Sequence, residues 1–281
     1  MNSITLPSHA KVNIGLRILN RRPDGYHTIH TVFQELEWHD SVTLTKQPQG
    51  CMITTNMSGI PCDDTNTCAK AYHLLKNNFP DIGGVNIHLQ KVIPPGTGLG
   101  GGSGNAATVL KGLNKLYHLS LTAGELESLA SRIGADVPFF IKGGTQIGDG
   151  IGERLTPVSS PVKGIYLLIL PELSISTAWA YGAWKNCLES SEQKPNFAHF
   201  FYGTTPSFSI FENDFERIVI PAHPEIGIIK NRLLRMGAEF AGLSGSGSTV
   251  FGIFDDEADA RLAESKFQPT CRTILTTPAN L

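Results

Sequence analysis

Apolar and polar residues alternate in several short stretches of the chain, and each such stretch predicts a β-strand. The clearest of them covers residues 9–18. One face of this stretch is apolar and the other is mostly polar: Val12, Ile14, Leu16 and Ile18 against Lys11, Asn13, Gly15 and Arg17. We therefore expect a half-buried strand whose Lys11 and Asn13 project from the same solvated polar face.

Similar patterns predict the other regular elements. Further strands are expected over residues 28–38 and 41–45, joined through His39 and Asp40, and over residues 85–89. Residues 163–170 are almost unbroken in their apolar character, which is typical of a strand buried on both faces. Helices are predicted after the capping residues 64–66, over 106–117, from the capping box of Thr122 and Glu125 to Gly134, over 174–181, over 225–236 and from 255 onward. Residues 189–209 show little periodicity, and we expect a loop there.

The composition is that of an ordinary globular protein. The chain has 281 residues, of which 41% are hydrophobic, and a formal net charge of −2. This balance gives no electrostatic case for binding nucleic acid or an anionic membrane. The five cysteines are scattered without a metal-binding spacing, so we expect buried apolar fillers in a reducing compartment: Cys51, Cys62, Cys68, Cys187 and Cys271. With no signal-like or membrane-spanning stretch, the expected location is the cytoplasm.

A glycine-rich run from Pro94 to Ala107 is the strongest functional signal. Six glycines fall within its fourteen residues, between a predicted strand and a predicted helix. Such a turn points backbone N–H groups and the positive end of a helix dipole toward an anion. A flexible linker would not be followed at once by an amphipathic helix. The run lacks the Gly-Lys-Ser/Thr ending of a Walker loop and the partner motifs of a protein kinase, so it predicts a third type of nucleotide-phosphate cradle.

Three further segments carry polar groups in positions suited to chemistry. Asp136 lies between a predicted helix end and an apolar segment, where it serves either as a turn residue or as the acid that a kinase needs beside an attacking hydroxyl. Residues 21–27 form a Pro-Asp-Gly turn followed by Tyr26 and His27, which either read a ligand or begin the next strand. Residues 242–249 are a loop of small residues that either binds an anion or is a tight turn.

These segments together resemble one family. Pro-x-x-x-Gly-Leu-Gly followed by Gly-Gly-Ser-x-Asn-Ala-Ala, over residues 94–107, resembles the phosphate loop of the GHMP small-molecule kinases. Residues 17–27, 134–140 and 243–248 resemble further motifs of the same family. The resemblance implies an α+β, two-domain GHMP kinase fold: an N-terminal ribosomal-protein-S5-like nucleotide domain over residues 1–156, a C-terminal α/β-sandwich substrate domain over 157–281, and an active site in the cleft between them.

The resemblance also implies roles for individual residues. Asp136 would be the general base, with Lys11 pairing with it, and Asn13 would donate to the substrate. The ATP phosphates would bind the loop residues Pro94, Gly96, Gly98, Leu99, Gly100, Gly101, Gly102, Ser103, Gly104 and Asn105. Asn66 and Lys91 would flank adenine, although the residues alone favour a helix-terminal Asn66 and a surface charge at Lys91. Cytosine would bind Tyr26, His27 and Tyr181, although a core aromatic fits Tyr181 nearly as well, and Thr177 would also bind the substrate.

The activity implied by the resemblance is phosphorylation of the 2-hydroxyl of 4-diphosphocytidyl-2-C-methyl-D-erythritol by ATP, in the non-mevalonate route to isoprenoids. Mg²⁺ would bridge phosphate oxygens, with no protein ligand assigned beyond the candidate Ser103. Gly104 stands where the family usually has a second serine, and Thr97 where glycine is common. The alternatives are a GHMP kinase for homoserine, mevalonate or a sugar, and a non-catalytic ligand sensor. We expect a monomer or a weak homodimer.

Overall fold

The computed structural model describes residues 1–184, 196–202 and 207–279. Its internal contacts divide the chain into two compact units, each made of several segments. The first contains Met1–Ala10, Trp38–Pro95 and Gly100–Gly143, and the second contains Lys11–Glu37, Gly96–Leu99 and Gly144–Leu281. Two long strands, β1 (Ser3–Arg21) and β2 (His27–Gln47), contribute residues to both units. The boundary predicted at residue 156 stays a prediction.

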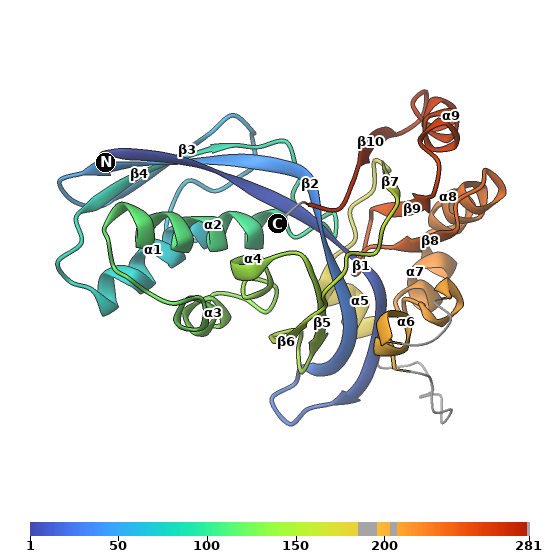
Figure 1. Cartoon of the computed structure of the whole chain (residues 1–281), viewed down its shortest axis with the longest axis horizontal. Helices are drawn as coiled ribbons and strands as arrows, with labels where there is room; N and C mark the ends of the chain where they lie inside the picture. Colours follow the sequence, from blue (N-terminus) through green and yellow to red (C-terminus); the bar gives the residue numbers. More distant parts are fainter. Residues whose placement is uncertain (185–195, 203–206, 280–281) are drawn as a thin grey trace. The chain divides into compact units, whose positions relative to one another are not determined.

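The first unit combines a sheet with four helices (Figure 1). The strands β3 (Cys51–Thr55) and β4 (Gly84–Gln90) are parallel, and β4 is antiparallel to the later half of β2, with Ser41 opposite Gln90. The helices are α1 (Thr67–Asn78), α2 (Gly101–Leu116), α3 (Ala123–Ser131) and α4 (Phe139–Lys142). Helices α1 and α2 lie side by side, and Gly112 of α2 approaches the Leu44 side chain of β2. This close packing fixes α2 against the sheet.

Local signals in the sequence explain where these helices begin. Asn66 caps α1 by accepting a hydrogen bond from the Cys68 N–H at 2.8 Å. Thr122 and Glu125 form the predicted capping box at the start of α3. Gly100 precedes α2 in a left-handed conformation, with φ of 72°, and provides no side-chain cap. The start of α2 is therefore built from backbone alone.

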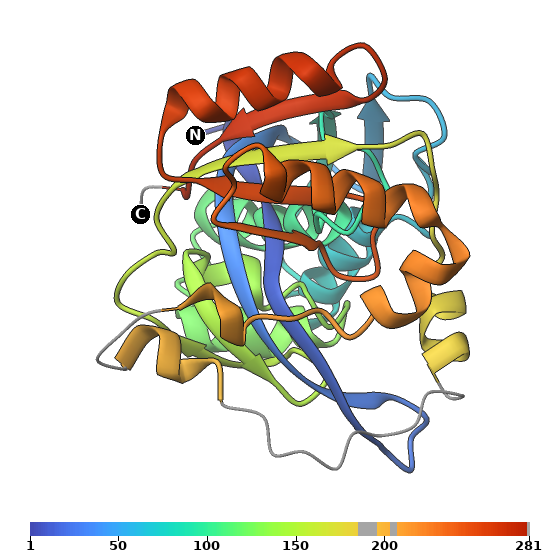
Figure 2. The same cartoon turned by 90° about the vertical axis from the view of Figure 1, so that its right-hand side faces the viewer.

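The second unit contains two groups of strands. The earlier half of β2 pairs with β1 and with β5 (Thr145–Asp149), which pairs with β6 (Arg154–Pro157). A separate antiparallel sheet has the order β10-β7-β9-β8, made of β10 (Arg272–Thr276), β7 (Ile165–Leu170), β9 (Val250–Phe254) and β8 (Phe240–Leu243). Helices α8 (Pro224–Arg235) and α9 (Glu257–Phe267) pack on this sheet (Figure 2). The remaining elements are α5 (Thr177–Trp184), α6 (Ala198–Tyr202), η1 (Phe208–Ile210) and α7 (Glu216–Ala222).

The core of the second unit joins its sheet to its helices. Leu167 and Ile169 of β7, Leu233 of α8 and Phe267 of α9 belong to one buried apolar cluster. Burial on both faces of β7 confirms the prediction from its unbroken apolar run.

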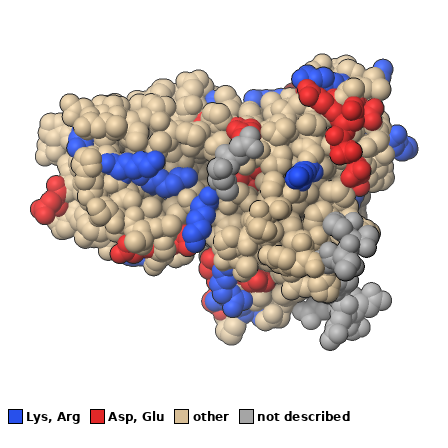
Figure 3. Space-filling model, viewed as in Figure 1, with Lys and Arg blue, Asp and Glu red and all other residues tan. Residues whose placement is uncertain are grey.

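The acidic side chains of α9 gather on the surface shown in Figure 3, where the helix N-terminus favours negative charge.

Residues 10–18 of β1 are buried on both faces, so the prediction of a solvated polar face is wrong. Lys11, Asn13 and Arg17 are only 3%, 2% and 6% exposed. Their polar groups have partners inside the second unit, since Lys11 donates to Asn13, and Arg17 pairs with Glu212 at 3.0 Å. Alternation in the sequence showed two chemically different faces. It could not show that distant segments cover the polar one.

Two predicted boundaries are also wrong. The expected strands 28–38 and 41–45 are one continuous strand, because the Asp40 side chain accepts hydrogen bonds from the backbone of Val92 and Ile93 and the chain stays extended. Helix α3 ends at Ser131, three residues before Gly134, and a turn follows.

The cysteine and loop predictions are wrong in part. Cys62 is exposed and Cys51 and Cys271 are half-buried, so only Cys68 is a buried filler among the described cysteines. Cys187 lies outside the described residues. The predicted loop 189–209 includes the short elements α6 and η1, and its residues 189–195 and 203–206 also lie outside the described part.

Candidate active site

The first half of the glycine-rich run, Gly96–Leu99, lies in the second unit and is held by backbone contacts. Lys11 N–H donates to the Leu99 carbonyl at 3.0 Å, and Thr249 N–H donates to the Thr97 carbonyl at 3.2 Å. The Ser244 hydroxyl donates to the Gly98 carbonyl at 2.9 Å. Gly98 has a φ of +80°, and a Cβ there would lie 2.0 Å from the Ser244 carbonyl oxygen. Only glycine fits this position.

The second half of the run begins α2 in the first unit. The N–H groups of a helix's first turn have no carbonyl partner within the helix, and the helix dipole adds positive potential there. Gly102 in this turn is exposed, and the nearest atom to a Cβ built on it is the Thr67 hydroxyl at 3.8 Å. Ser103 beside it is half-buried. Unpaired donors, positive potential and a bare backbone together suit an anionic ligand.

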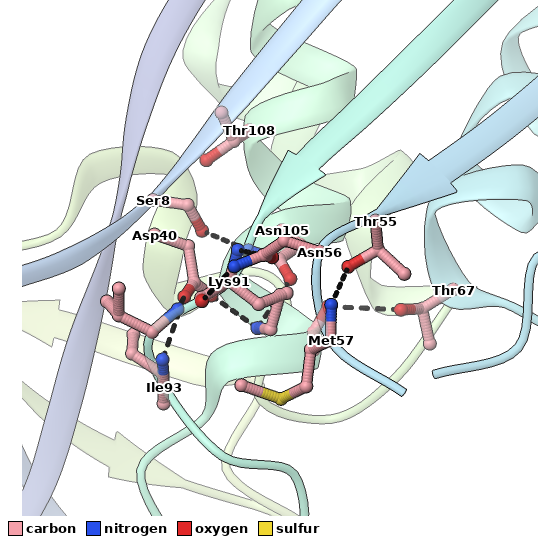
Figure 4. Close-up of polar contacts among 12 residues, drawn as sticks. Ser8, Asp40, Thr55, Asn56, Met57, Thr67, Lys91, Ile93, Asn105 and Thr108 are labelled. Carbon is pink, nitrogen blue, oxygen red and sulfur yellow. Dashed lines mark hydrogen bonds and ion pairs between the residues drawn. The ribbon is translucent and has the colours of Figure 1, made fainter. Parts of the chain in front are cut away.

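A buried polar cluster lies under this helix start (Figure 4). Lys91 is only 4% exposed, so the alternative of a surface charge is wrong. Its ammonium group donates to the Asp40 carboxylate and, at 2.8 Å, to the Asn105 side-chain oxygen. The Asn105 amide donates in turn to the Ser8 hydroxyl at 2.9 Å and to Asp40 at 3.0 Å. Two predicted ATP-binding residues, Lys91 and Asn105, are thereby brought together.

The start of α1 lies close to the start of α2. Asn66 is the N-cap of α1, as the residues alone favoured, and its amide donates to the Pro61 carbonyl at 2.6 Å. The adjacent Thr67 hydroxyl donates to the Gly102 carbonyl at 3.0 Å. This bond links the two helix starts, while contact of Asn66 with adenine stays a prediction.

Lys11 and Asn13 form a buried pair on β1. The Lys11 ammonium donates to the Asn13 side-chain oxygen at 2.6 Å and lies 5.4 Å from the centre of the Phe33 ring. The Asn13 amide donates to the Thr31 hydroxyl at 2.9 Å, and the Asn13 N–H donates to the Ser244 hydroxyl at 3.4 Å. Because Ser244 also bonds Gly98, the pair is anchored to the first half of the glycine-rich run.

Asp136 lies in a turn of the first unit, just before α4. It is half-buried, and the following residues Val137, Phe139 and Phe140 are buried. This is the partly apolar setting expected of a base. Lys11 belongs to the second unit, so the predicted pairing of Lys11 with Asp136 stays a prediction.

The predicted cytosine residues lie in the second unit. The rings of His27 and Tyr181 stack with their centres 5.4 Å apart and an angle of 13° between them. Tyr26 is 60% exposed, whereas His27 is 8% exposed. The Thr177 hydroxyl lies 2.9 Å from the Ser246 hydroxyl. A stacked pair of rings and an exposed tyrosine suit a flat heteroaromatic ligand.

Sequence reasoning missed several residues that support the site. Asp40 was expected only to join two strands. Asn213 is buried, and its amide donates to the carbonyls of Leu243 at 2.7 Å and Gly245 at 2.8 Å, which holds the small-residue loop. These partners are 30 or more residues away in the sequence, and no local signal points to them.

Within residues 1–184, 196–202 and 207–279, no group of three or more His, Cys, Asp or Glu side chains is arranged to hold a metal ion. In the same residues, no helix combines the length and the apolar character needed to span a membrane.

The chain matches two family models. Residues 66–144 match the GHMP kinases N terminal domain, and residues 207–272 match the GHMP kinases C terminal model. Among solved structures, a 4-(cytidine 5'-diphospho)-2C-methyl-D-erythritol kinase has a TM-score of 0.81 and 30% identity, covering 99% of this chain and 100% of that one. A homoserine kinase from Cytophaga hutchinsonii has a TM-score of 0.76 at 18% identity, covering 99% and 95%, and shows a common fold.

Curated relatives agree over nearly the full length. The 4-diphosphocytidyl-2-C-methyl-D-erythritol kinase of Prosthecochloris aestuarii is 38% identical over 98% of each chain. The protein of that name from Acetivibrio thermocellus is 38% identical over 94% of each chain. The predicted α+β GHMP fold is thereby confirmed. The chain therefore belongs to the GHMP kinases, on the branch of the 4-diphosphocytidyl-2-C-methyl-D-erythritol kinases, and is an ATP-dependent small-molecule kinase.

Proposed function

We propose that this kinase transfers the γ-phosphoryl group of ATP to the 2-hydroxyl of 4-diphosphocytidyl-2-C-methyl-D-erythritol, giving the 2-phosphate and ADP in the non-mevalonate route to isoprenoids. The observation that carries the choice of acceptor is the stacked pair of His27 and Tyr181 next to the exposed Tyr26. An acceptor without a nucleobase, such as mevalonate or homoserine, gives these rings nothing to stack on.

The ATP phosphates would bind the glycine-rich run. The first turn of α2, with Gly102 and Ser103, offers N–H donors and positive potential to them. Mg²⁺, when bound, would neutralise phosphate charge, held largely by phosphate oxygens and water, with the Ser103 hydroxyl as the fitting protein ligand. A single protein hydroxyl is enough for a metal ion whose other ligands come from the substrate and water.

Asp136 and Lys11 would supply the proton and charge chemistry. The acceptor oxygen forms its bond to the γ-phosphorus as its proton passes to the Asp136 carboxylate, and the bond from phosphorus to the β-phosphate oxygen breaks to release ADP. The buried Lys11 ammonium would stabilise the negative charge of the transferring group. Asn13, which orients Lys11 through their 2.6 Å contact, would donate to the substrate.

The rings of Tyr26, His27 and Tyr181 would hold the cytosine. Stacking contributes about 1–3 kcal/mol per base but does not select one base over another. Selection would come from hydrogen bonds to the cytosine edge, donated or accepted by the His27 imidazole. Thr177, in the first turn of α5, would offer a hydroxyl to the same substrate.

The test of the function measures ADP release with Mg-ATP and a panel of alcohols. The panel contains the cytidine compound, the same alcohol without cytidine, mevalonate, homoserine and galactose. We expect turnover with the intact cytidine compound alone. Turnover with another member would identify a different GHMP kinase. Binding of ATP and acceptor without turnover would identify a ligand sensor.

Two variants test the assigned residues. Tyr26→Ala should raise the KM for the acceptor and leave the KM for ATP unchanged, and Tyr202→Ala, at an equally exposed tyrosine of α6, is its control. Asp136→Asn should lower kcat by orders of magnitude with ATP affinity preserved, compared with Asp255→Asn at an exposed carboxylate. Near-normal turnover of Asp136→Asn would refute its role as base.

A further inference from the structure

We propose that Asp40 is a positioning residue for ATP binding: its buried carboxylate ties the segment that enters the glycine-rich run to the helix that leaves it. The inference rests on the proposed binding of ATP phosphates at the start of α2. Asp40 lies in the middle of β2 and is 0% exposed. A carboxylate at such a place is costly unless every oxygen has partners.

One carboxylate oxygen of Asp40 fixes the chain before the run. This oxygen accepts hydrogen bonds from the N–H groups of Val92 at 2.7 Å and Ile93 at 2.9 Å. Both residues come immediately before Pro94, the first residue of the run. The direction in which the chain enters the run is therefore set by the Asp40 side chain.

The other oxygen fixes the helix after the run. It accepts from the Lys91 ammonium and, at 3.0 Å, from the Asn105 amide, while Lys91 also donates to the Asn105 oxygen at 2.8 Å (Figure 4). The three side chains form a closed triangle. Since Asn105 is the fifth residue of α2, the triangle sets the position of the helix's first turn.

The charge arrangement explains why this position needs a carboxylate. A Cβ at Gly101, the first residue of α2, would lie 3.2 Å from the Lys91 ammonium nitrogen. A cation this close to a helix N-terminus is unfavourable, because the dipole is positive there. The Asp40 carboxylate offsets this repulsion, so Lys91 stays buried beside the first turn of α2 and the turn keeps its position. Without Asp40, the unpaired ammonium would repel the helix start or move toward the nucleotide.

The cluster around Asp40 bears on binding of the phosphoryl donor, ATP, and not on binding of the acceptor. The hydrogen-bond partners of Asp40, Lys91 and Asn105 outside this triangle lie in the first unit: Ser8, Asn56, Val92 and Ile93. The rings proposed to hold cytosine lie in the second unit. Loss of Asp40 should therefore weaken ATP binding and leave acceptor binding unchanged.

The experiment compares four variants of the full chain. Asp40→Asn keeps the shape of the side chain but places an amide against Lys91. Lys91→Met removes the ammonium, and the double variant Asp40→Asn/Lys91→Met removes the whole ion pair without leaving a buried unpaired charge. Asn114→Ala is the matched control, because the Asn114 side chain makes two 3.0 Å hydrogen bonds to Leu121 near the other end of α2.

We expect Asp40→Asn to raise the KM for ATP roughly tenfold or more, with the acceptor KM changed less than about twofold. The double variant should match Lys91→Met, since both residues act through the same contacts. Asn114→Ala should lower the unfolding midpoint and leave the ATP KM unchanged. If Asp40→Asn does not fold, the ATP KM of the double variant is compared with that of Asn114→Ala instead.

Three results would overturn the proposal: an unchanged ATP KM in Asp40→Asn, an equal rise in Asn114→Ala, or native ATP affinity in the double variant. Calorimetry with a non-hydrolysable ATP analogue gives the same comparison without any acceptor. Failure of the native chain to use the cytidine compound would thus count against the proposed acceptor alone, and loss of analogue binding by Asp40→Asn would still support the positioning role.

Discussion

Replacing Gly98 by alanine tests how the glycine-rich run is built. Gly98 has a φ of +80°, a conformation that costs an L-residue with a side chain about 1–2 kcal/mol. A Cβ there would also lie 2.0 Å from the Ser244 carbonyl oxygen and 3.1 Å from that of Gly247. Both obstacles are backbone atoms, so no side-chain rotation relieves the contact. Gly98→Ala therefore forces the run or the small-residue loop to move.

The cost follows from what holds the two segments. The Ser244 carbonyl accepts from Gly247 N–H at 2.9 Å, and the Ser244 N–H donates to Thr249. Moving this loop breaks bonds of that kind, and forced overpacking typically costs about 1–3 kcal/mol. Together with the conformational strain, we expect Gly98→Ala to lower the free energy of unfolding by roughly 2–5 kcal/mol. The affinity for ATP should fall as well, because the run is displaced.

Gly96→Ala is the matched control. Gly96 has a φ of +70°, yet a Cβ there would meet no atom within 4 Å. It therefore carries the strain without the collision and should cost about 1–2 kcal/mol. Urea unfolding of both variants and their KM for ATP provide the comparison. Equal losses in the two variants would refute the argument that close approach to Ser244 shapes the run.

Three further predictions concern stability and reactivity. Asn66→Ala should remove the cap of α1 and lower the free energy of unfolding by about 1 kcal/mol in urea. Hydrogen bonds from the Thr122 N–H and hydroxyl hold the pKa of Glu125 below its usual range, so the stability that Glu125 adds is present above the unfolded-state pKa and lost as pH falls through the folded-state pKa. The difference in urea midpoint between the native chain and Glu125→Gln should therefore shrink in acid, and a constant difference would contradict this. Burial raises the pKa of Cys68 to about 12, so in a thiol-reagent assay of the native chain the exposed Cys62 should react well before Cys68.

Short-range signals in the sequence predicted the parts of the fold that depend on neighbouring residues. The cap at Asn66, the capping box of Thr122 and Glu125, and the buried strand around Leu167 all follow from residues within a few positions. The glycine-rich run was also predicted from its own residues, and Gly96, Gly98 and Gly100 have positive φ angles that glycine adopts readily.

Long-range partners explain what the sequence could not predict. Lys11 and Asn13 form an ordinary polar face in the sequence, and their burial depends on Thr31 and Ser244. Asp40 is of a residue type that favours turns. Its place in a continuous strand depends on hydrogen bonds from the backbone N–H groups of Val92 and Ile93, 52 and 53 residues later. Polar groups of this kind are buried only when distant segments supply their partners, and local patterns carry no information about those segments.

One fold can serve different acceptors because the glycine-rich run is built mainly from backbone contacts, whereas other parts of the site are built from side chains. The glycine-rich run is held by N–H and carbonyl groups and by a buried cluster around Asp40, and these contacts need no particular acceptor. The homoserine kinase of Cytophaga hutchinsonii shares the fold at low identity, so the fold alone does not choose the alcohol. Under the proposed function the choice lies in side chains outside the run, and Tyr26, His27 and Tyr181 are stacked or exposed rings outside it. Changing these rings should therefore alter which alcohol is used while the chemistry of the run persists.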